Sequence, residues 1–382
     1  MSRNPRLISS DNLALTVYPK ILKLIFGDIF YKPPILNITV VASSGQQCNT
    51  LPPSPPSMRC LVTGGGGFLG SHLAEALLTR GHTVAVVDDL FRGRKANMVD
   101  FKAMPDFTFV LGDCANVEKL EKAEEKMNGV DIVFHLAAIN GTRYFHERPD
   151  LVIDVNIKTT ETVVKFATDR GARLVFTSSP EAFGMQDGMP LGENLDAIFP
   201  SPHDHFRHSY GASKYLGEII VQYAVKERGL DGRIIRPFNG YGPRLMGNEH
   251  GQVTAIFLHQ CQRGKDITLH GDGSQTRCFT WYNDLINGII TLGELDEGLD
   301  GSTLQGASFN IGSTDEVSIH QVAKLALEVT GADVEIVMTE GHPGDSTRRV
   351  PDISAAQAAL GWSSTIGISE GMARCWEWID VE

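Results

Sequence analysis

The feature that most limits the fold of this 382-residue chain is a glycine-rich segment, residues 63–70, which reads Thr-Gly-Gly-Gly-Gly-Phe-Leu-Gly. A short apolar run at residues 59–62 comes directly before it, as expected of a buried strand. Residues 71–78 follow it, and their apolar side chains recur with the spacing of a helix. The order strand, glycine turn, helix is typical of folds that bind a dinucleotide, because a helix N-terminus attracts a pyrophosphate.

Three glycines of this turn have separate predicted tasks. Gly64 permits the tight turn from strand to helix, Gly67 lets the backbone approach a pyrophosphate, and Gly70 lets helix and strand pack closely. Such a motif is weak evidence alone, but the strand before it and the helix after it strengthen it. The residues of this turn that we predict to line a cofactor site are Gly64, Gly67, Phe68, Leu69 and Gly70.

Further strand-like runs alternate with helix-like stretches along the next 120 or so residues, and each run ends in small or polar residues. These ends include Asp88, Asp113, Ala137 and Ser179. Alternation of this kind predicts an α/β fold with a Rossmann-type doubly wound parallel sheet. Ligands of such sheets bind beyond the carboxyl ends of the strands, so we expect these four residues to lie around one site.

The acid at the second strand end bears on the choice of cofactor. A carboxylate at Asp88 would accept hydrogen bonds from ribose hydroxyls and repel a 2′-phosphate, which favours NAD over NADP. Asp113 is predicted to lie near the adenine, and Ala137 to line the same cofactor site. Two alternatives stay open: Arg92 or Arg94 could hold a phosphate, and the two aspartates could serve only the turns at their strand ends.

Tyr210 and Lys214, four positions apart, form a candidate pair for proton transfer. On a helix they share one face. An ammonium group beside a phenol favours the phenolate, so we expect Lys214 to lower the pKa of Tyr210 and let it act as a general base toward an alcohol. Ser179 could hydrogen-bond the same substrate oxygen. Without the dinucleotide turn, the pair would indicate no more than an amphipathic helix with an exposed lysine.

These motifs, in this order, resemble those of the extended short-chain dehydrogenase/reductases, which include the nucleotide-sugar epimerases, dehydratases and decarboxylases. The likeness extends from Met58 to about Trp376 and includes later segments at residues 236–244, 270–277 and 345–352. It implies an NAD-dependent enzyme with a smaller C-terminal substrate-binding α/β region and a nucleotide-sugar substrate, expected to be a UDP-sugar. It also implies a homodimer packed through the helix that carries the tyrosine.

Carried over residue by residue, the resemblance implies substrate contacts and a mechanism. Asn239, Arg277 and Arg349 would meet the diphosphate or ribose of the substrate, and a guanidinium suits a diphosphate because it pairs with two oxygens at once. Arg143, in a loop that matches no subfamily, could hold a sugar carboxylate or a phosphate. Tyr210 would take a proton from a sugar hydroxyl, typically at C4, while NAD receives the hydride and later returns it.

The fate of the transient 4-keto sugar depends on the strand end near Ser179. Glu181 stands where the dehydratases and decarboxylases have glutamate, and where plain 4-epimerases usually have a small or hydroxylic residue. We therefore predict a catalytic Glu181, which favours removal of the C5 proton or decarboxylation. Pro180 departs from the pattern, since dehydratases often have an acid or serine there. Epimerisation, dehydration and decarboxylation of UDP-glucuronate stay open, and so does a Glu181 turned toward solvent.

Composition sets wider limits on function and location. A net charge of −12 argues against nucleic acid as the main partner. Six scattered cysteines with no C-x-x-C pair indicate free thiols in a reducing compartment, so we expect a cytoplasmic protein. No apolar run is long enough to span a membrane. We expect no metal, although the histidines of residues 203–208 have a spacing that zinc accepts.

The chain is expected to divide into three parts. Residues 1–57 carry basic charge and end in a proline-rich linker, and we interpret them as an unstructured extension, a targeting leader or an upstream start. Residues 58–235 would form the NAD-binding domain with the catalytic residues, and residues 236–382 the nucleotide-sugar-binding region. Two other functions are alternatives: a non-catalytic dinucleotide-binding sensor, and an NADPH-dependent reductase of free carbonyl compounds.

Overall fold

The computed structural model describes residues 57–203, 205–248, 251–341 and 344–379. The chain divides into two units, residues 1–55 and 56–382, and all the described residues belong to the second. The predicted N-terminal extension therefore lies outside the described residues, apart from Ser57. Within the described part of the chain, no helix combines the length and the hydropathy that a membrane crossing needs.

A seven-stranded parallel sheet forms the centre of this unit, in the spatial order β11, β6, β5, β4, β1, β2, β3. The strands are β1 Arg59–Thr63, β2 Thr83–Asp88, β3 Phe107–Leu111, β4 Ile132–His135, β5 Arg173–Thr177, β6 Gly232–Pro237 and β11 Ser308–Ile311. This is the Rossmann-type doubly wound sheet expected from the alternation of strands and helices, so the predicted fold class is confirmed. The strand order reverses between β1 and β4, and sheets of this kind bind ligands beyond the strand ends at that point.

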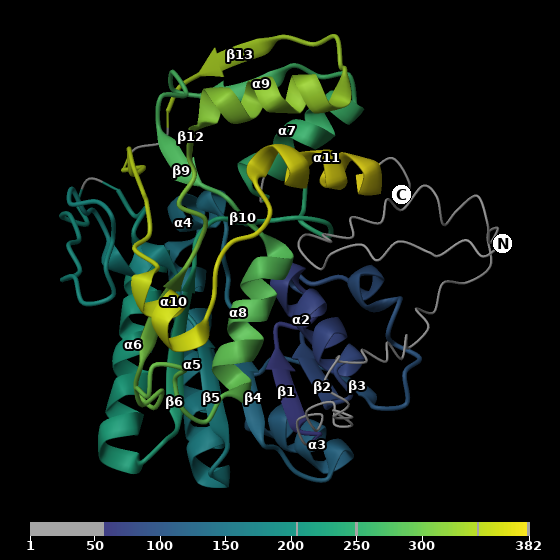
Figure 1. Cartoon of the computed structure of the whole chain (residues 1–382), viewed down its shortest axis with the longest axis vertical. Coiled ribbons are helices and arrows are strands. Elements are labelled where there is room, and N and C mark those ends of the chain that lie inside the picture. Colours follow the sequence, from purple (N-terminus) through teal and green to yellow (C-terminus); the bar gives the residue numbers. More distant parts are fainter. Residues whose placement is uncertain (1–56, 204, 249–250, 342–343, 380–382) are drawn as a thin grey trace, which may run out of the picture. The chain divides into compact units, whose positions relative to one another are not determined.

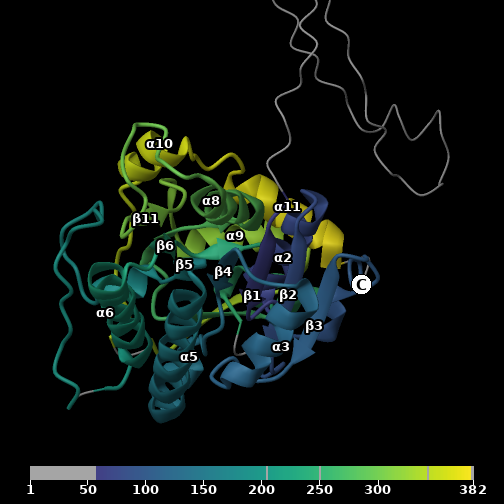
Figure 2. The same ribbon diagram turned by 90° about the horizontal axis from the view of Figure 1, so that it is seen from below.

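Helices cover both faces of the sheet, as Figure 2 shows from below. α3 (Val117–Met127), α5 (Pro149–Arg170) and α6 (Ser209–Arg228) lie on one face, and α2 (Phe68–Thr79) and α8 (Tyr282–Glu294) lie on the other. Strands covered on both sides must be apolar along their length, and the interior residues of β1, β2, β4 and β5 are accordingly buried on both faces. Two apolar clusters, one under each layer of helices, make up the core.

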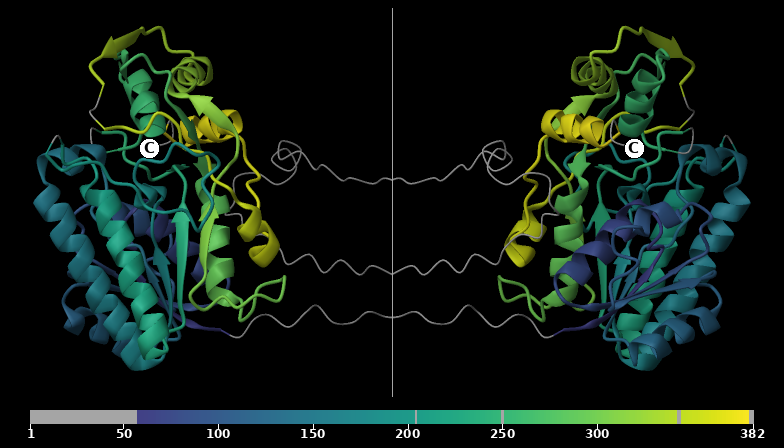
Figure 3. Two further views of the ribbon diagram at one scale, coloured as in Figure 1. Left: turned by 90° about the vertical axis from the view of Figure 1, so that its left-hand side faces the viewer. Right: turned by 90° about the vertical axis from the view of Figure 1, so that its right-hand side faces the viewer.

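A smaller α/β region lies at the top of Figure 1. Its helices α7 (Val253–Gln262), α9 (Ile319–Thr330) and α11 (Ile368–Ile379) pack around an apolar core of their own. Three strand pairs belong to it or border it: β7 Gly240–Tyr241 with β10 Thr280–Trp281, β8 Ile267–His270 with β13 Ile336–Thr339, and β9 Thr276–Cys278 with β12 Glu316–Ser318. Both views of Figure 3 place this region beyond the carboxyl ends of the central strands.

The second half of the chain also completes the central sheet, because β11 pairs with β6 and α8 packs beneath the same strands. Asp284, near the start of α8, fastens the chain between α10 (Ser354–Leu360) and α11. Its carboxylate accepts hydrogen bonds from the backbone nitrogen (2.8 Å) and the hydroxyl (2.6 Å) of Thr365, and its carbonyl accepts one from Nε1 of Trp362 (2.7 Å). The predicted boundary at residue 235 thus passes through a shared sheet.

Candidate active site

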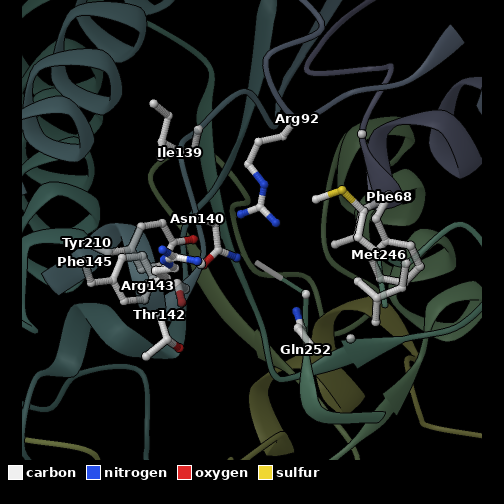
Figure 4. Close-up of a pocket in the computed structure, with 18 of the residues that line it drawn as sticks. Phe68, Arg92, Ile139, Asn140, Thr142, Arg143, Phe145, Tyr210, Met246 and Gln252 are labelled. Carbon is white, nitrogen blue, oxygen red and sulfur yellow. The ribbon is translucent and has the colours of Figure 1, made fainter. Parts of the chain in front are cut away.

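A cavity of about 1180 Å³ opens beyond the carboxyl ends of the strands. This volume exceeds the roughly 300–1,000 Å³ of a single-ligand pocket, as a site for cofactor and substrate together requires. Figure 4 shows Phe68 and Met246 on one side of the cavity, Phe145 and Tyr210 on the other, and Arg92 pointing between them. The residues predicted from sequence to act here all line it: Gly64, Gly67, Phe68, Leu69, Gly70, Asp88, Asp113, Ala137, Arg143, Ser179, Glu181, Tyr210, Lys214, Asn239, Arg277 and Arg349.

The glycine turn between β1 and α2 leaves no room for side chains. Gly64 has a φ of +74°, which favours glycine, and a Cβ there would lie 2.7 Å from the backbone nitrogen of Ala137. A Cβ on Gly70 would overlap the carbonyl oxygen of Gly64. Gly67 is the N-cap of α2, and in the described structure neither a capping side chain nor a first-turn acid occupies that helix end. The turn therefore fits the pyrophosphate of a dinucleotide.

The two acids at the strand ends hold their own turns as well as facing the cavity. Asp88 accepts hydrogen bonds from the backbone nitrogens of Gly66 (2.8 Å) and Leu90 (2.7 Å), and Asp113 accepts one from Ala115 (2.8 Å). Burial raises the pKa of Asp88, although the bonds from both amides oppose the shift. Asp88 and Asp113 therefore stabilise the turns at their strand ends and also line the cavity where a cofactor contact was expected.

Tyr210, Lys214 and Ser179 meet at one end of the cavity. Tyr210 is buried, and the side chain of Ser179, the N-cap of η2 (Pro180–Phe183), is near enough to lower the pKa of its phenol. Lys214 donates from Nζ to the carbonyl oxygen of Thr177 (2.8 Å), and its Nζ lies 5.8 Å from the centre of the Tyr210 ring. Burial lowers the pKa of Lys214 to about 8. The structure therefore brings together the three residues that the sequence placed in separate motifs.

The expected effect of Lys214 on the pKa of Tyr210 is not observed. Burial raises the pKa of the phenol, and the Glu181 carboxylate raises it further, while the Ser179 hydrogen bond and the Arg92 cation lower it. The ammonium of Lys214 is directed to a backbone carbonyl instead. An oxidised nicotinamide beside Tyr210 would add a positive charge that favours the phenolate.

Glu181 lies in a group of four charged side chains, in which the two arginines are buried, Glu181 is mostly buried and Asp345 is partly exposed. Its carboxylate accepts two hydrogen bonds from Arg207 (both 3.1 Å) and one from Nη1 of Arg349 (2.5 Å), and Arg207 also donates through Nε to Asp345 (2.8 Å). Burial would raise the pKa of Glu181, but the guanidinium groups of Arg349 and Arg207 outweigh it and hold the pKa well below its ordinary value. We call these residues the four-charge cluster.

The four-charge cluster changes two expectations drawn from the sequence. Removal of a C5 proton was one role expected of Glu181, yet a carboxylate with so low a pKa is a weak base. Arg349 was expected to meet the substrate diphosphate, but it donates to Glu181 and to the carbonyl oxygen of Gly184 (3.4 Å). The arrangement suits an ion pair within the protein better than the transfer of a proton.

Sequence reasoning missed two side chains that support Tyr210. Phe145, from α4 (Thr142–Glu147), stacks on the Tyr210 ring with centroids 4.9 Å apart and planes 10° apart. Arg207 lies over Phe145, 5.1 Å from the ring centre. Arg207 stands just before α6, where a positive charge opposes the helix dipole. An arginine at this unfavourable position could have indicated, from the sequence alone, that Arg207 pairs with acids elsewhere in the fold.

Arg277, on β9, is the predicted substrate residue whose charge is least compensated. It donates to the carbonyl oxygen of Thr276 (2.8 Å), and within the described structure it forms no ion pair with an acid. Burial lowers its pKa to about 10, and the neighbouring Arg349 adds to this shift. A partly buried guanidinium without a carboxylate partner, facing a cavity, is suited to an anionic ligand.

The other predicted substrate residues already have protein partners. Asn239 has a φ of +37° and donates from Nδ2 to the carbonyl oxygen of Cys278 (2.9 Å). Arg143 pairs with Glu147 (2.8 Å) one turn further along α4, and its side chain is more exposed than that of Arg277. These contacts fix both side chains at the wall of the cavity.

The histidine-rich segment before α6 was considered as a metal site. The rings of His205 and His208 lie 5.5 Å apart. No three His, Cys, Asp or Glu side chains gather as metal ligands in the part of the chain that the structure describes, and Asp204 lies outside it.

The dinucleotide turn and the Tyr210–Lys214 pair, facing one cavity, define a class of NAD-dependent enzymes that act on alcohols. Comparison with known protein families shows to which family within that class the chain belongs. The model of the NAD dependent epimerase/dehydratase family matches residues 60–312. The chain belongs to this family, which confirms the resemblance seen in its motifs and identifies NAD as its cofactor.

Relatives of known function are similar over most of their length. UDP-glucuronic acid decarboxylase 3 of Arabidopsis thaliana is 31% identical, over 87% of this chain and 95% of the relative. UDP-N-acetyl-alpha-D-glucosaminuronate decarboxylase of Bacillus cytotoxicus is also 31% identical, over 84% and 97%. Among solved structures, UDP-glucuronic acid 4-epimerase of Bacillus cereus, in complex with UDP-glucuronic acid and NAD, matches with a TM-score of 0.76 and 27% identity, over 85% and 99%.

Proposed function

We propose that this enzyme decarboxylates a UDP-hexuronate, such as UDP-glucuronate, through a transient 4-keto sugar. One observation carries the proposal: the dinucleotide turn, the Tyr210–Lys214 pair and Arg277, which has no ion-pair partner in the described structure, line the same cavity. The relatives named above support a nucleotide-sugar substrate with a carboxylate at C6. Arg277 supplies a cation for the diphosphate.

The reaction begins at C4 of the sugar. Tyr210 takes the proton of the C4 hydroxyl, and Ser179 hydrogen-bonds the same oxygen. Bound NAD accepts the hydride from C4 and returns it in the last step. The oxidised sugar is a β-keto acid, so its C5–C6 bond breaks, carbon dioxide leaves, and the electron pair forms an enolate whose oxygen is at C4. A solvent proton is added at C5, and Tyr210 returns its proton to the C4 oxygen.

Dehydration fits the site less well than decarboxylation does. Loss of the C6 hydroxyl requires a base that removes the C5 proton, and Glu181 is held as an ion-paired carboxylate with a strongly lowered pKa. Pro180 beside it has no polar side chain that could take over. Decarboxylation needs no such base, because the breaking C5–C6 bond itself releases the electron pair.

Epimerisation at C4 is the second candidate, because it also needs no base at C5. The similarity to the UDP-glucuronic acid 4-epimerase favours it, since that protein retains the carboxylate of its sugar. The two reactions share the first step and differ only in whether the 4-keto intermediate loses carbon dioxide or rotates before the hydride returns.

The test is to incubate the purified protein and NAD with UDP-glucuronate, UDP-N-acetylglucosaminuronate and UDP-glucose, and to identify products by mass. The proposal predicts loss of carbon dioxide from a hexuronate and no change in UDP-glucose. A product of unchanged mass with inverted C4 would establish the epimerase instead. Turnover of UDP-glucose alone, or of ketones that carry no nucleotide, would refute both.

Replacing Arg277 by Gln should raise KM for the nucleotide sugar about 10- to 100-fold and leave kcat within a few-fold. A charge-assisted hydrogen bond contributes about 1.5–3 kcal/mol, and this contact to the diphosphate is the same in the ground and transition states. Steady-state kinetics over a range of substrate concentrations separate the two constants. Arg374→Gln, which removes an exposed guanidinium paired with Glu370, is the control and should change neither.

The homodimer expected from the sequence has a candidate surface on α6. Its outer face exposes four large apolar side chains at helical spacing, more than a solitary surface helix ordinarily shows: Tyr215, Leu216, Ile219 and Tyr223. We propose that a second copy of this chain covers this face, with the same helix contributed by each protomer.

Ile219→Asp should convert the protein to a monomer, because burial of an unpaired carboxylate in an apolar interface is unfavourable. Light scattering coupled to size-exclusion chromatography gives the mass in solution. Leu299→Asp introduces the same charge at another exposed aliphatic residue and should leave the dimer intact. A monomeric wild-type protein, or an equal effect of the two variants, would contradict this assignment.

A further inference from the structure

Arg207 contacts three other side chains near the active site, and the proposed reaction does not assign it a role. Its guanidinium donates to both carboxylate oxygens of Glu181 and through Nε to Asp345, and it lies over the ring of Phe145. The residue is only 5% exposed. Its guanidinium is therefore held by Glu181, by Asp345 and by the ring of Phe145. Loss of either acid would leave a buried charge without full compensation, which is unfavourable.

Two of these contacts lead to Tyr210. Phe145 lies between Arg207 and the Tyr210 ring, and the hydroxyl of Ser209, the residue before Tyr210, donates to the carbonyl oxygen of Phe145 (3.3 Å). The Glu181 backbone nitrogen donates to the hydroxyl of Ser179 (3.2 Å), and that hydroxyl lowers the pKa of the neighbouring Tyr210. Arg207 therefore holds the two groups that contact the ring and the hydroxyl of the proposed base.

The third contact leads to the smaller region. Asp345 lies four residues before Arg349, in the chain that returns from that region to the sheet, and both pair with residues of the Rossmann half. Arg207 and Glu181 thus fasten this segment by two ion pairs. The cluster contains two cations and two anions, so its net charge is zero, but Glu181 lies close enough to Tyr210 that its carboxylate raises the pKa of the phenol.

We propose that Arg207 is a positioning residue for proton transfer at C4: it orients Tyr210 through Phe145 and Glu181, and Asp345 fixes Arg207 in that orientation. This inference rests on the proposed function only in that Tyr210 takes the C4 proton, a step that decarboxylation and epimerisation share. Asp345 pairs with Arg207 and would affect Tyr210 only by way of it. A substitution of Asp345 therefore tests the positioning role of Arg207 more specifically than a substitution of Arg207 itself.

The experiment compares Arg207→Gln, Arg207→Lys, Asp345→Asn and the double variant Arg207→Gln/Asp345→Asn. Arg348→Gln is the matched control, because Arg348 lies in the same segment but pairs with Glu316 and not with Glu181. Thermal unfolding of the NAD-loaded proteins, without substrate, gives a double-mutant cycle. The pH profile of kcat is then measured with whichever UDP-sugar the wild-type enzyme converts.

In Arg207→Gln we expect kcat to fall at least 10-fold with KM changed less than threefold, and the acid limb of the kcat profile to move up by about 0.5–1 pH unit. The direction follows from charge: Glu181 raises the pKa of Tyr210, and Arg207 is one of the two cations that offset Glu181. The other charged groups near Tyr210, Arg92 and Lys214, are unchanged. Arg207→Lys should restore the profile but only part of kcat, because an ammonium lacks the planar fork.

Asp345→Asn should lower kcat less than Arg207→Gln, and the double variant should match Arg207→Gln in both kcat and Tm. A purely structural role would lower Tm and leave the pH profile of kcat in place, and that result would overturn the inference. Effects on Tm that add fully in the double variant would also overturn it. Failure of the proposed function shows separately, as wild-type enzyme that converts a UDP-sugar without losing carbon dioxide.

Discussion

Replacing Tyr210 by Phe should lower kcat about 1,000-fold while NAD remains bound and the fold stays intact. General-base catalysis contributes about 10²–10⁴-fold, and the phenol oxygen is the only part of the side chain that the substitution removes. The phenylalanine keeps the stacked contact with Phe145, whose ring lies 4.9 Å away, so we expect little change in stability. Single-turnover formation of product, followed by mass, measures the chemical step directly.

Two controls and one direct test make the Tyr210→Phe result interpretable. The NAD content of the denatured variant shows whether the cofactor site is unaffected, and thermal unfolding shows whether the core is. A direct test of the same step is to monitor reduced NAD during the first turnover, which the variant should not accumulate. Retention of kcat within a few-fold of the wild type would mean that another group removes the C4 proton, and the assignment of Tyr210 would be wrong.

Glu181→Gln should destabilise the protein by about 3 kcal/mol near neutral pH, because it removes one partner of a buried ion pair and leaves Arg349 without its acid. It should also change how stability depends on pH. The folded-state pKa of Glu181 lies well below its ordinary value of 4.5, so its contribution is complete above about pH 4.5 and is lost as pH falls below that value.

Chemical denaturation from pH 7 down to pH 3 tests whether the stabilising contribution of Glu181 is lost as the pH falls. The wild type should lose stability more steeply than Glu181→Gln below pH 4.5, and the two curves should run parallel above about pH 5.5. Glu370→Gln, which breaks an exposed pair with Arg374, should cost about 0.5 kcal/mol or less across the range. Curves that stay parallel throughout would show that Glu181 is not held as a low-pKa carboxylate.

The cofactor half of the site could be predicted from sequence because its signals are local. The turn at residues 63–70 needs glycine for steric reasons that act within a few residues, and the structure shows the overlap that a side chain on Gly70 would cause. Asp88, Asp113, Ala137 and Ser179 follow apolar runs directly, and parallel strands bring their ends to one edge. Periodicity therefore predicted five of the seven strands of the sheet, and the position of the cavity with them.

The partners of Glu181 could not be predicted in the same way. Arg207 lies 26 residues from it in sequence and Arg349 lies 168 residues away. No local spacing relates these residues, and a glutamate at a strand end is compatible with solvent, a base or an ion pair. The resemblance to known families marked its position as catalytic, but only the packing of the smaller region against the sheet brings Arg349 to it.

For Tyr210, the sequence predicted the position of the side chain but not its pKa. Spacing placed Tyr210 and Lys214 on one helix face, which the structure confirms, yet the expected effect on the pKa requires a distance and a direction. Lys214 directs its ammonium to a carbonyl oxygen, and burial dominates the pKa of the phenol. Electrostatic effects depend on all nearby charges and on the exclusion of water, and neither is encoded in the spacing of two residues.

By itself, the sequence determined five strands of the sheet, the dinucleotide turn and many of the residues around the cavity, because short-range sterics and hydrophobic periodicity act between near neighbours in the chain. Only the tertiary structure decided that Glu181 is an ion-paired carboxylate, that Arg207 and Phe145 support Tyr210, and that Arg277 keeps an uncompensated charge. Those properties arise where segments more than 20 residues apart meet in a buried site, and there the balance of desolvation and charge sets what each side chain can do.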